Sequence, residues 1–421
     1  EMFGHLDFRE PNGYGYANIY YGESREEALD KEHCETLDCM SIHNGRIVNT
    51  LGSKAFRYVY IEKSNNISFT LAMYQEYSPC DVQHSGSFRC SDSLLNQIWD
   101  VAAYTMDLTT QEFFMDRIKR GRWTWSGDAI QSYLMNYYLR FDTECVKRTI
   151  RQLRGKDPVT AHINTIMDYT FYWFMSIQDY YEYTGDTDFV REMWPRMKSL
   201  MDYVLGRTNS EGMAEGKHDD WIFVDWVDFP MHKRGTLCFE QILFICALRT
   251  MGKAAIICGD KEKHDYYRSL AEELYRKLFD TFWSNEKHAF LHAIEAGWLN
   301  PQITKFPNMF ALLHLTMSEE QQQQIMEHVI LNPDIAPITT PYMRFYELET
   351  LCEMGYHTKV LKEIRDYWGG MLKEGATTFW EKYNPNETKL SADQKILRDK
   401  MFVYQDGKNC ERITEWIKDL K

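Results

Sequence analysis

Hydrophobic residues recur at helical spacing over most of the chain after residue 90. Apolar positions three and four apart, opened by Ser, Asp or Thr and followed by Gly, Pro or Asp, predict about eleven helices. These helices are predicted at 91–108, 128–140, 143–154, 168–184, 187–205, 236–258, 262–282, 308–316, 318–329, 342–354 and 357–372. The two longest interruptions, 206–235 and 283–307, predict loops of the kind that carry functional side chains.

The first eighty or so residues instead predict strands. The segments "FRYVYIE" (56–62) and "ISFTLAMYQEY" (67–77) are rich in β-branched and aromatic residues, and the polar turn "KSNN" separates them. These strands are too few for an independent sheet domain with closed edges. We therefore expect part of a β-sandwich before the helices.

Consecutive helices with alternating short and long connections predict a mainly α fold, an (α/α)6 barrel of helix pairs. A helical solenoid is the alternative, but the sequence has no fixed-length repeat. The predicted organisation is a partial β-sandwich at 1–88, a barrel at 89–386 and an atypical tail at 387–421.

Composition narrows the range of partners. The net charge of −14 argues against nucleic acid or an anionic membrane surface, because both require a basic face. The sequence contains no apolar run long enough to span a membrane. Its ten cysteines are scattered without a CxxC pair, which predicts neither a disulfide framework nor a zinc site. Aromatic residues reach 15%, which suits a large core and also a carbohydrate site.

The stretch "DRIKRGRWTWSGD" (116–128) places carboxylates, cations and tryptophans on a short loop before a helix. Carboxylates accept hydrogen bonds from sugar hydroxyls, arginine donates them, and indole faces stack on sugar rings, so the stretch indicates a sugar site. Structural alternatives stay open. Asp128 would cap the helix with Gln131 as its capping-box partner, Asp116 would belong to a surface ion pair, and Trp123 and Trp125 would pack in the core.

Two further clusters lie in predicted loops. In "HDDWIFVDWVDFP" (218–230) four aspartates alternate with two tryptophans, and "GATTFWEKYNP" (375–385) contains Glu381 directly after Trp380. A calcium site is the rival interpretation of the first, but the run lacks the D-x-D-x-D-G spacing of a calcium loop. A solvated surface carboxylate is the alternative for Glu381.

These clusters, together with "HINTIMDYTFYWF" (162–174) and "TPYMRFYELETLCEMG" (340–355), resemble the bacterial α-L-rhamnosidases of glycoside hydrolase family 78. The resemblance covers roughly residues 85–386, in the same order and at compatible spacings. It implies a catalytic (α/α)6 barrel preceded by a β-sandwich, and hydrolysis of terminal α-L-rhamnose from plant glycans or glycosides with inversion. The implied partner is an L-rhamnosyl carbohydrate, and the implied mechanism requires no metal or other cofactor.

The resemblance also implies roles for individual residues. Glu381 would be the general base that activates water. The rhamnose subsite would be lined by Asp116, Arg120, Trp125 and Asp128, with Trp173, Asp225 and Trp226 contributing to the same pocket. In inverting hydrolysis a carboxylic acid protonates the leaving oxygen, and the base lies across the ring, roughly 6.5–9.5 Å from that acid.

The chain departs from the family at the general-acid position. The family has Glu or Asp directly after the arginine that Arg120 matches, and this sequence has Gly121, which has no proton to give. Losing a general acid lowers the rate about 10²–10⁴-fold. An engineered knock-out, a homologue that binds without cutting, and takeover by Asp116 or Asp128 are the open explanations. We expect weak or absent activity on natural substrates.

A second departure follows "NPNET" (384–388), where the His-Ala-Trp segment that introduces the family's last helix is missing. The segment 391–401 is one candidate replacement. A non-catalytic rhamnose-binding homologue and a helical-barrel hydrolase for another sugar remain alternative functions. The sequence leaves the oligomeric state open, and it does not decide between the periplasm and the cytoplasm of a bacterium.

Overall fold

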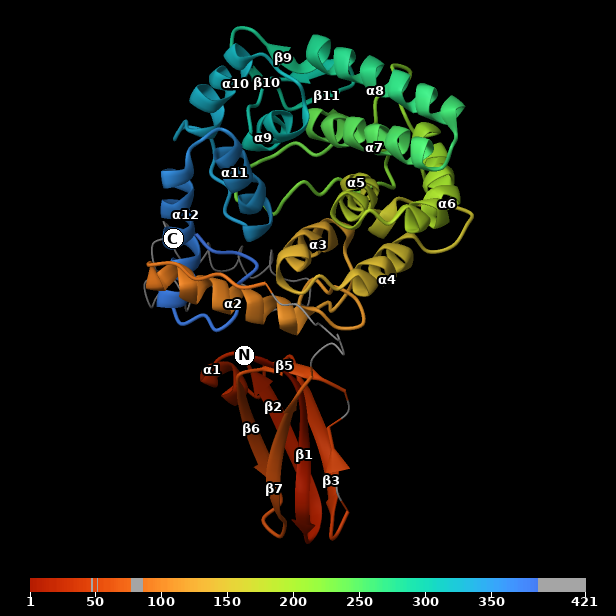
Figure 1. Ribbon diagram of the computed structural model, residues 1–421. Coiled ribbons are helices and arrows are strands. Elements are labelled where there is room, and N and C mark those ends of the chain that lie inside the picture. Colours follow the sequence, from red (N-terminus) through yellow and green to blue (C-terminus); the bar gives the residue numbers. More distant parts are fainter. Residues whose placement is uncertain (47, 51, 77–85, 385–421) are drawn as a thin grey trace, which may run out of the picture. The chain divides into compact units, whose positions relative to one another are not determined.

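The computed structural model describes residues 1–46, 48–50, 52–76 and 86–384. Its N-terminal part consists of two antiparallel sheets (Figure 1). In the first sheet, β1 (Met2–Asn12) pairs with β4 (Val48–Asn49), β5 (Lys54–Phe56) and β7 (Ser68–Gln75). In the second, β2 (Tyr14–Gly22) lies between β3 (Leu37–His43) and β6 (Tyr58–Lys63). A short helix, α1 (Arg25–Leu29), follows β2.

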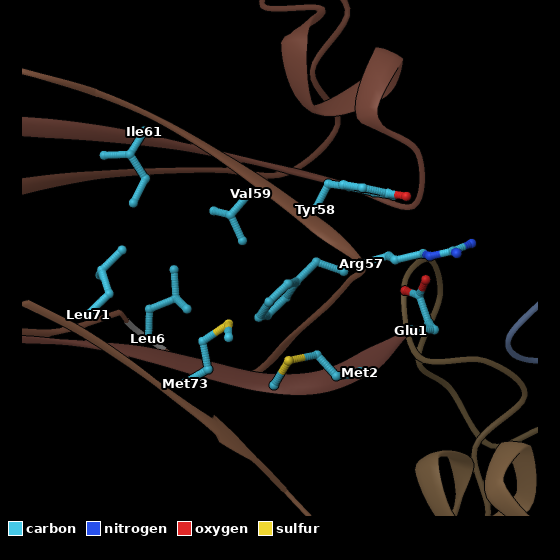
Figure 2. Close-up of a pocket in the computed structure, with 10 residues that line it drawn as sticks. Glu1, Met2, Leu6, Arg57, Tyr58, Val59, Ile61, Leu71 and Met73 are labelled. Carbon is cyan, nitrogen blue, oxygen red and sulfur yellow. The ribbon is translucent and has the colours of Figure 1, made fainter.

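Alternate side chains of both sheets form one apolar core, as expected of a sandwich. Leu6 and Phe8 of β1 pack with Ile19 and Tyr21 of β2 and with Phe56 of β5. Towards one end the sheets enclose a hollow of about 510 Å³, lined mainly by apolar side chains and bordered by Glu1 and Arg57 (Figure 2). Its lining lacks the carboxylate clusters singled out in the sequence.

The two predicted strands are confirmed as β6 and β7, but they belong to different sheets. β6 pairs with β2, and β7 pairs with β1. The segment between them therefore crosses from one sheet to the other instead of closing a hairpin. Local alternation locates a strand, whereas its partner depends on contacts that lie far away in the sequence.

All eleven predicted helices are present, with ends shifted by a few residues. They are α2 (Ser93–Thr109), α3 (Ser126–Leu139), α4 (Thr143–Arg154), α5 (Met167–Thr184), α6 (Thr187–Leu205), α7 (Cys238–Ile257), α8 (Lys261–Phe282), α9 (Lys305–His314), α10 (Glu319–Ile325), α11 (Pro341–Glu353) and α12 (His357–Lys373). A π-helical turn, Met326–Ile330, continues α10. None of the helices in the described part is both long and apolar enough to cross a membrane.

The predicted loops are partly folded. Short strands β8 (Thr236–Leu237), β11 (Ala293–Glu295) and β12 (Trp298–Asn300) form one small sheet, and β9 (Trp283–Ser284) pairs with β10 (Ala289–Phe290). A single 3₁₀ turn, Ile163–Thr165, precedes α5. The long segment between α6 and α7 is mostly irregular.

The helices are arranged as inner and outer layers, which confirms the helical-barrel prediction (Figure 1). Helices α3, α5, α7, α9 and α11 pack in succession in the inner layer, and the intervening even-numbered helices lie outside them. Outer helix α12 also packs against α2. The predicted tail at 387–421, including the proposed replacement helix at 391–401, lies outside the described residues.

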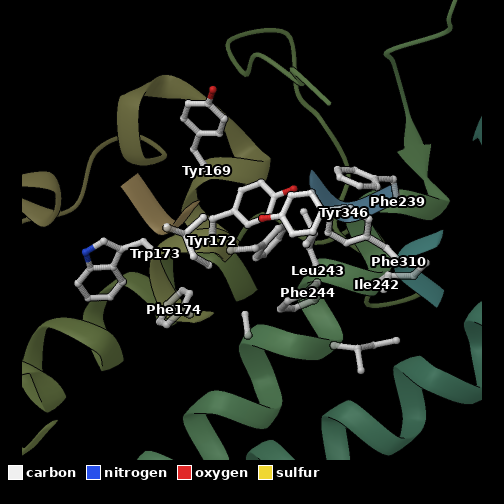
Figure 3. Close-up of a cluster of buried hydrophobic side chains, with 14 of the residues drawn as sticks. Tyr169, Tyr172, Trp173, Phe174, Phe239, Ile242, Leu243, Phe244, Phe310 and Tyr346 are labelled. Carbon is white, nitrogen blue, oxygen red and sulfur yellow. The ribbon is translucent and has the colours of Figure 1, made fainter. Parts of the chain in front are cut away.

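The core lies where the inner helices meet. Helix α7 is buried on almost all sides, and its Phe239 and Phe244 contact aromatic rings of neighbouring helices. In Figure 3, Tyr172 of α5 lies between Trp173 on one side and Phe239 and Phe244 on the other. Many aromatic side chains in the described part of the chain therefore belong to the core, and the exposed ones are left for a ligand.

Candidate active site

The first turns of three inner helices meet at one point. Gly127 in α3 lies against Tyr169 of α5 and Tyr342 of α11: a Cβ at this position would stand 2.5 Å from Cε1 of Tyr169 and 2.4 Å from the hydroxyl of Tyr342. The Tyr169 hydroxyl donates to Oδ2 of Asp128 over 3.4 Å. Trp125 packs edge-on against the Tyr169 ring, with centroids 6.2 Å apart. Helix starts far apart in the chain therefore surround Asp128.

The loop before α3 is closed by a pair of hydrogen bonds. The Trp123 N–H donates to Oδ1 of Asp116 over 2.8 Å, and the Asp116 N–H donates to the Trp123 carbonyl over 3.0 Å. Arg117 then joins this loop to the 375–384 segment. Its Nε donates to Oδ2 of Asp116 and its Nη1 to Oε2 of Glu381, both over 3.0 Å.

The three carboxylates share one electrostatic environment. Burial, followed by the charge of Asp116, raises the pKa of Asp128 to about 7, and the charge of Glu381 acts in the same direction. Burial also raises the pKa of Asp116, against the opposing effects of the Trp123 N–H and Arg117. Asp128 remains half-buried, so a solute can still reach it. The structure thus brings together Asp116, Asp128 and Glu381.

Asp168 in the first turn of α5 holds the second cluster in place. Its fully buried carboxylate accepts the backbone N–H groups of Phe223 and Val224, over 3.2 and 2.8 Å. Burial raises the pKa of Asp168 to about 6, and these two N–H groups partly oppose the rise. Val224 adopts a φ of +55°, a strained conformation for a β-branched residue. The hydrogen bonds to Asp168 offset this strain and fix the backbone before Asp225.

Asp225 points into the protein. Its side chain is buried, and both carboxylate oxygens lie 2.8 Å from the hydroxyl of Thr340, the residue that caps α11. Burial raises its pKa to about 7, although the Thr340 hydroxyl opposes the rise. Asp225 therefore ties the long loop to the start of α11.

The remaining aspartates of this loop have cationic partners. Arg207 donates to Asp219 over 2.8 Å and to Asp220 over 2.7 Å, and Lys382 forms an ion pair with Asp228. Each of these aspartates is thus bound by a cationic side chain. Within the described ranges no three His, Cys, Asp or Glu side chains are grouped as a metal site.

Trp226 stays available at the surface. Its ring is about half exposed, and it packs edge-on against Phe223 with centroids 5.2 Å apart. Trp123 is similarly exposed. The ion pair between Lys382 and Asp228 links this loop to the residue next to Glu381. All three sequence clusters are thus connected by side-chain contacts.

Two candidates lie elsewhere. Trp173 is 0% exposed, and its indole N–H donates to the Ile150 carbonyl of α4 over 2.9 Å, so its placement in the sugar pocket is corrected to the core. Arg120 binds both carboxylate oxygens of Glu35 over 2.6 Å, which directs its guanidinium to the N-terminal part. A single sequence cannot reveal which face of an all-apolar helix or which side of a charged loop a residue occupies.

The expected capping role of Asp128 is wrong. Helix α3 begins two residues earlier, its N-cap is Trp125, and no side chain caps it. Gln131, the expected capping-box partner, donates to the Tyr342 carbonyl over 2.8 Å instead. The Asp128 carboxylate is therefore available to the site.

Gly121 lies at the surface of this cluster with a φ of +72°, a conformation that favours glycine. A Cβ built there would be 3.0 Å from Oδ2 of Asp116 and 3.2 Å from Nε of Arg117. A side chain at this position would extend beside the carboxylates. Position 121 therefore lies beside Asp116 and Arg117.

Sequence reasoning passed over three residues that organise the site: Arg117, Tyr169 and Thr340. Signals for two of them were present. Thr340 precedes Pro341, a frequent N-cap and first-turn pair, and Tyr169 follows a buried Asp in the segment 162–174. Arg117 had no distinguishing signal among the four cations of its loop.

A layered helical barrel with carboxylates at the start of its inner helices and exposed tryptophans in the adjoining loops suits an enzyme that acts on carbohydrates. Comparison with known proteins agrees. Residues 83–395 match the family described as bacterial alpha-L-rhamnosidase 6 hairpin glycosidase domain, and residues 1–61 match the family described as alpha-rhamnosidase-like, bacteroidetes, N-terminal. The chain therefore belongs to the bacterial α-L-rhamnosidase six-hairpin glycosidase family.

Individual relatives are distant. An α-L-rhamnosidase of Formosa agariphila is 25% identical over 174 residues, which cover 35% of this chain and 18% of that protein. The crystal structure of a GH78-family rhamnosidase from Bacillus sp. GL1 is 25% identical, with a TM-score of 0.81 over 92% of this chain and 42% of that one. A rhamnosidase from Klebsiella oxytoca with rhamnose bound shares the fold, with 21% identity and a TM-score of 0.74 over 93% of this chain and 81% of that one.

The chain spans less than half the length of the Formosa and Bacillus proteins that it matches. The match of residues 83–395 establishes the family, and the solved structures share its fold.

Proposed function

We propose that this protein is an inverting glycoside hydrolase of the α-L-rhamnosidase type, acting on terminal α-L-rhamnose of plant glycans or glycosides, with activity weakened by Gly121. The observation that carries the proposal is the contact of Arg117 with both Asp116 and Glu381 beside Asp128. A cluster of carboxylates flanked by aromatic rings suits a ligand rich in hydroxyls, whose O–H groups donate and whose C–H faces stack.

Each part of the site has a proposed role. Asp116 and Asp128 accept hydrogen bonds from the sugar hydroxyls, and Trp125 and Trp226 supply apolar surface to the ring. Asp225 does not contact the sugar, because its carboxylate is buried and accepts the hydroxyl of Thr340; its role is to hold the long loop against the start of α11. The contact with Glu35 makes Arg120 an anchor of the loop rather than a ligand of the sugar.

Glu381 is the proposed general base. Its Oε2 is bound by Arg117, which orients the carboxylate and leaves Oε1 for a water molecule. The base takes a proton from this water as the oxygen attacks C1, and the bond from C1 to the leaving oxygen breaks on the opposite face of the ring. This displacement inverts the configuration at C1.

Gly121 removes the expected proton donor. An alkoxide of a second sugar is a poor leaving group without protonation, whereas an aryl oxide leaves readily. The loss of a general acid costs about 10²–10⁴-fold in rate. The deficit therefore falls mainly on rhamnosyl disaccharides.

A dinitrophenyl α-L-rhamnoside and a rhamnosyl disaccharide, assayed side by side, test the proposal. We expect measurable turnover of the first and little of the second, with Gly121→Asp raising the rate on the disaccharide. Aspartate is the preferred replacement because it tolerates a positive φ better than most residues. Glu381→Gln should abolish turnover of both substrates. Turnover retained by Glu381→Gln would show that another group activates water.

A second candidate function is rhamnose binding without turnover. It is favoured by Gly121, which has no proton to give to a leaving oxygen. Calorimetry with rhamnose separates the two functions: binding without hydrolysis of any activated glycoside supports this alternative. A panel of other aryl glycosides tests whether a different sugar is the substrate.

A further inference from the structure

The guanidinium of Arg117 lies beside the position that lacks an acid. A Cβ at residue 121 would stand 3.2 Å from its Nε and 3.6 Å from its Nη2. A longer acidic side chain at this position would extend into the space near these nitrogens. Arg117 is thus the cationic group next to the place of the missing proton donor.

The position of Arg117 is fixed from two sides. Its Nε donates to Asp116 and its Nη1 to Glu381, both over 3.0 Å. These two hydrogen bonds hold the guanidinium plane and do not use Nη2, the nitrogen 3.6 Å from the built Cβ of residue 121. A guanidinium held in this way is a preorganised donor, which needs little rearrangement when negative charge develops near it.

Arg117 stabilises charge but cannot replace an acid. A guanidinium stays protonated throughout the ordinary pH range, so it donates hydrogen bonds without releasing a proton. A leaving oxygen next to Nη2 therefore gains electrostatic stabilisation and departs as an anion. Leaving groups that are stable as anions therefore depart readily from such a site, whereas sugar alkoxides still depart slowly.

We propose that Arg117 stabilises the departing oxyanion in place of a general acid, and that this restricts the site to phenolic α-L-rhamnosides. The inference rests on the proposed rhamnosidase function and adds its substrate class. Water attacks C1 while Glu381 accepts its proton, the bond from C1 to the phenolic oxygen breaks, and the electron pair leaves with that oxygen. The phenolate departs beside Arg117 and takes a proton from solvent after release.

The test is the dependence of kcat/KM on the leaving group. A series runs from dinitrophenyl through nitrophenyl to unsubstituted phenyl α-L-rhamnoside, with the methyl glycoside as the poorest leaving group. We expect log kcat/KM of the unmodified protein to fall steeply with the pKa of the leaving phenol. Gly121→Asp should flatten this dependence, because a proton donor then neutralises the leaving oxygen.

Arg117→Gln removes the charge and keeps a hydrogen-bonding group. Loss of an oxyanion donor costs about 10²–10³-fold in rate, and we expect a loss of this size on the phenyl glycoside. The loss should be smaller on the dinitrophenyl glycoside, which makes the dependence steeper. Arg117→Lys should recover part of the rate because it restores the charge. Arg191→Gln is the matched control, since Arg191 of α6 donates to Thr187 and Asp188 of its own helix, away from the candidate site.

Three results would overturn the inference. An equal loss on every substrate in Arg117→Gln means that Arg117 only positions Glu381. A shallow dependence in the unmodified protein that steepens in Asp128→Asn means that Asp128 donates the proton. Absence of turnover with every rhamnoside, including dinitrophenyl, refutes the proposed function itself. The last result differs from the first two, in which the protein is still a rhamnosidase.

Discussion

At the residue scale, the surroundings of a carboxylate decide what it contributes. Asp128 is enclosed by Tyr169 and the start of α3, and burial raises its pKa to about 7. Asp219 in the long loop is exposed, and the hydrogen bond from Arg207 lowers its pKa. The two residues share one chemistry, yet their ionised forms are disfavoured in one place and favoured in the other.

This contrast gives two opposite dependences of stability on pH. For Asp128 the folded pKa lies above the unfolded one, so its stabilising contribution is present near pH 4 and is lost as the pH rises towards about 7. Relative to the unmodified protein, Asp128→Asn should therefore become more stable between pH 4 and pH 8. Asp219→Asn should show the reverse trend in a lower range, because its deficit stays constant above about pH 4 and shrinks as the pH falls below that value. Urea midpoints from about pH 2 to about pH 8 measure both trends, and parallel curves for Asp128→Asn and the unmodified protein would contradict the raised pKa.

At the element scale, periodicity located the helices and could not locate the strand partners. A helix forms from contacts three and four residues apart, so eleven of them followed from local pattern. Strands β6 and β7 lie in different sheets, and each pairs with a strand more than 35 residues earlier in the chain. A local pattern cannot reveal a pairing over that separation. The same limit applies to the site. The clusters were visible in sequence, but the contact of Arg117 with Glu381 spans 264 residues.

The junction of three helix starts also depends on the absence of a side chain. Gly127→Ala would place a methyl group against Tyr169 and Tyr342, both in rigid first turns. Such overpacking costs about 1–3 kcal/mol. Gly252→Ala in α7 is the control: its nearest neighbour is 3.7 Å away, and replacing a helical glycine gains up to about 1 kcal/mol. In thermal unfolding, Gly127→Ala should melt at a lower temperature than Gly252→Ala. Equal melting temperatures would show that α3, α5 and α11 can move apart to accommodate the methyl group.

At the scale of the whole molecule, residues next to the site are anchored to a short helix and two loops of the N-terminal part. Lys119 forms an ion pair with Glu27, Arg120 binds Glu35, and Arg122 donates to the Ser53 carbonyl over 2.7 Å. These three residues surround Gly121 in the chain. The orientation of the loop that carries Asp116 and Arg117 therefore depends on a part of the protein that contains no candidate catalytic residue.

Glu35→Gln tests this dependence. Exposed ion pairs contribute up to about 1 kcal/mol, so we expect little change in melting temperature. Turnover of an aryl rhamnoside should nevertheless fall several-fold, because the loop loses an anchor. Glu192→Gln is the control, since Glu192 binds Arg151 with the same two-pronged geometry on the outer helices. Equal activity of the two variants would mean that the loop keeps its orientation unaided.

The anchors of the 116–128 loop bear on how this protein can be dissected. A shortened polypeptide that starts just before α2 would retain every inner helix and the aromatic core, and would pass the usual checks of folding by circular dichroism. It would lack Glu27 and Glu35, the acidic partners of Lys119 and Arg120. Its spectrum would therefore indicate a folded protein although the 116–128 loop had lost both ion pairs. Removing the N-terminal part at this boundary would leave the barrel intact, yet a ligand screen of the shortened protein would wrongly suggest that the site binds nothing.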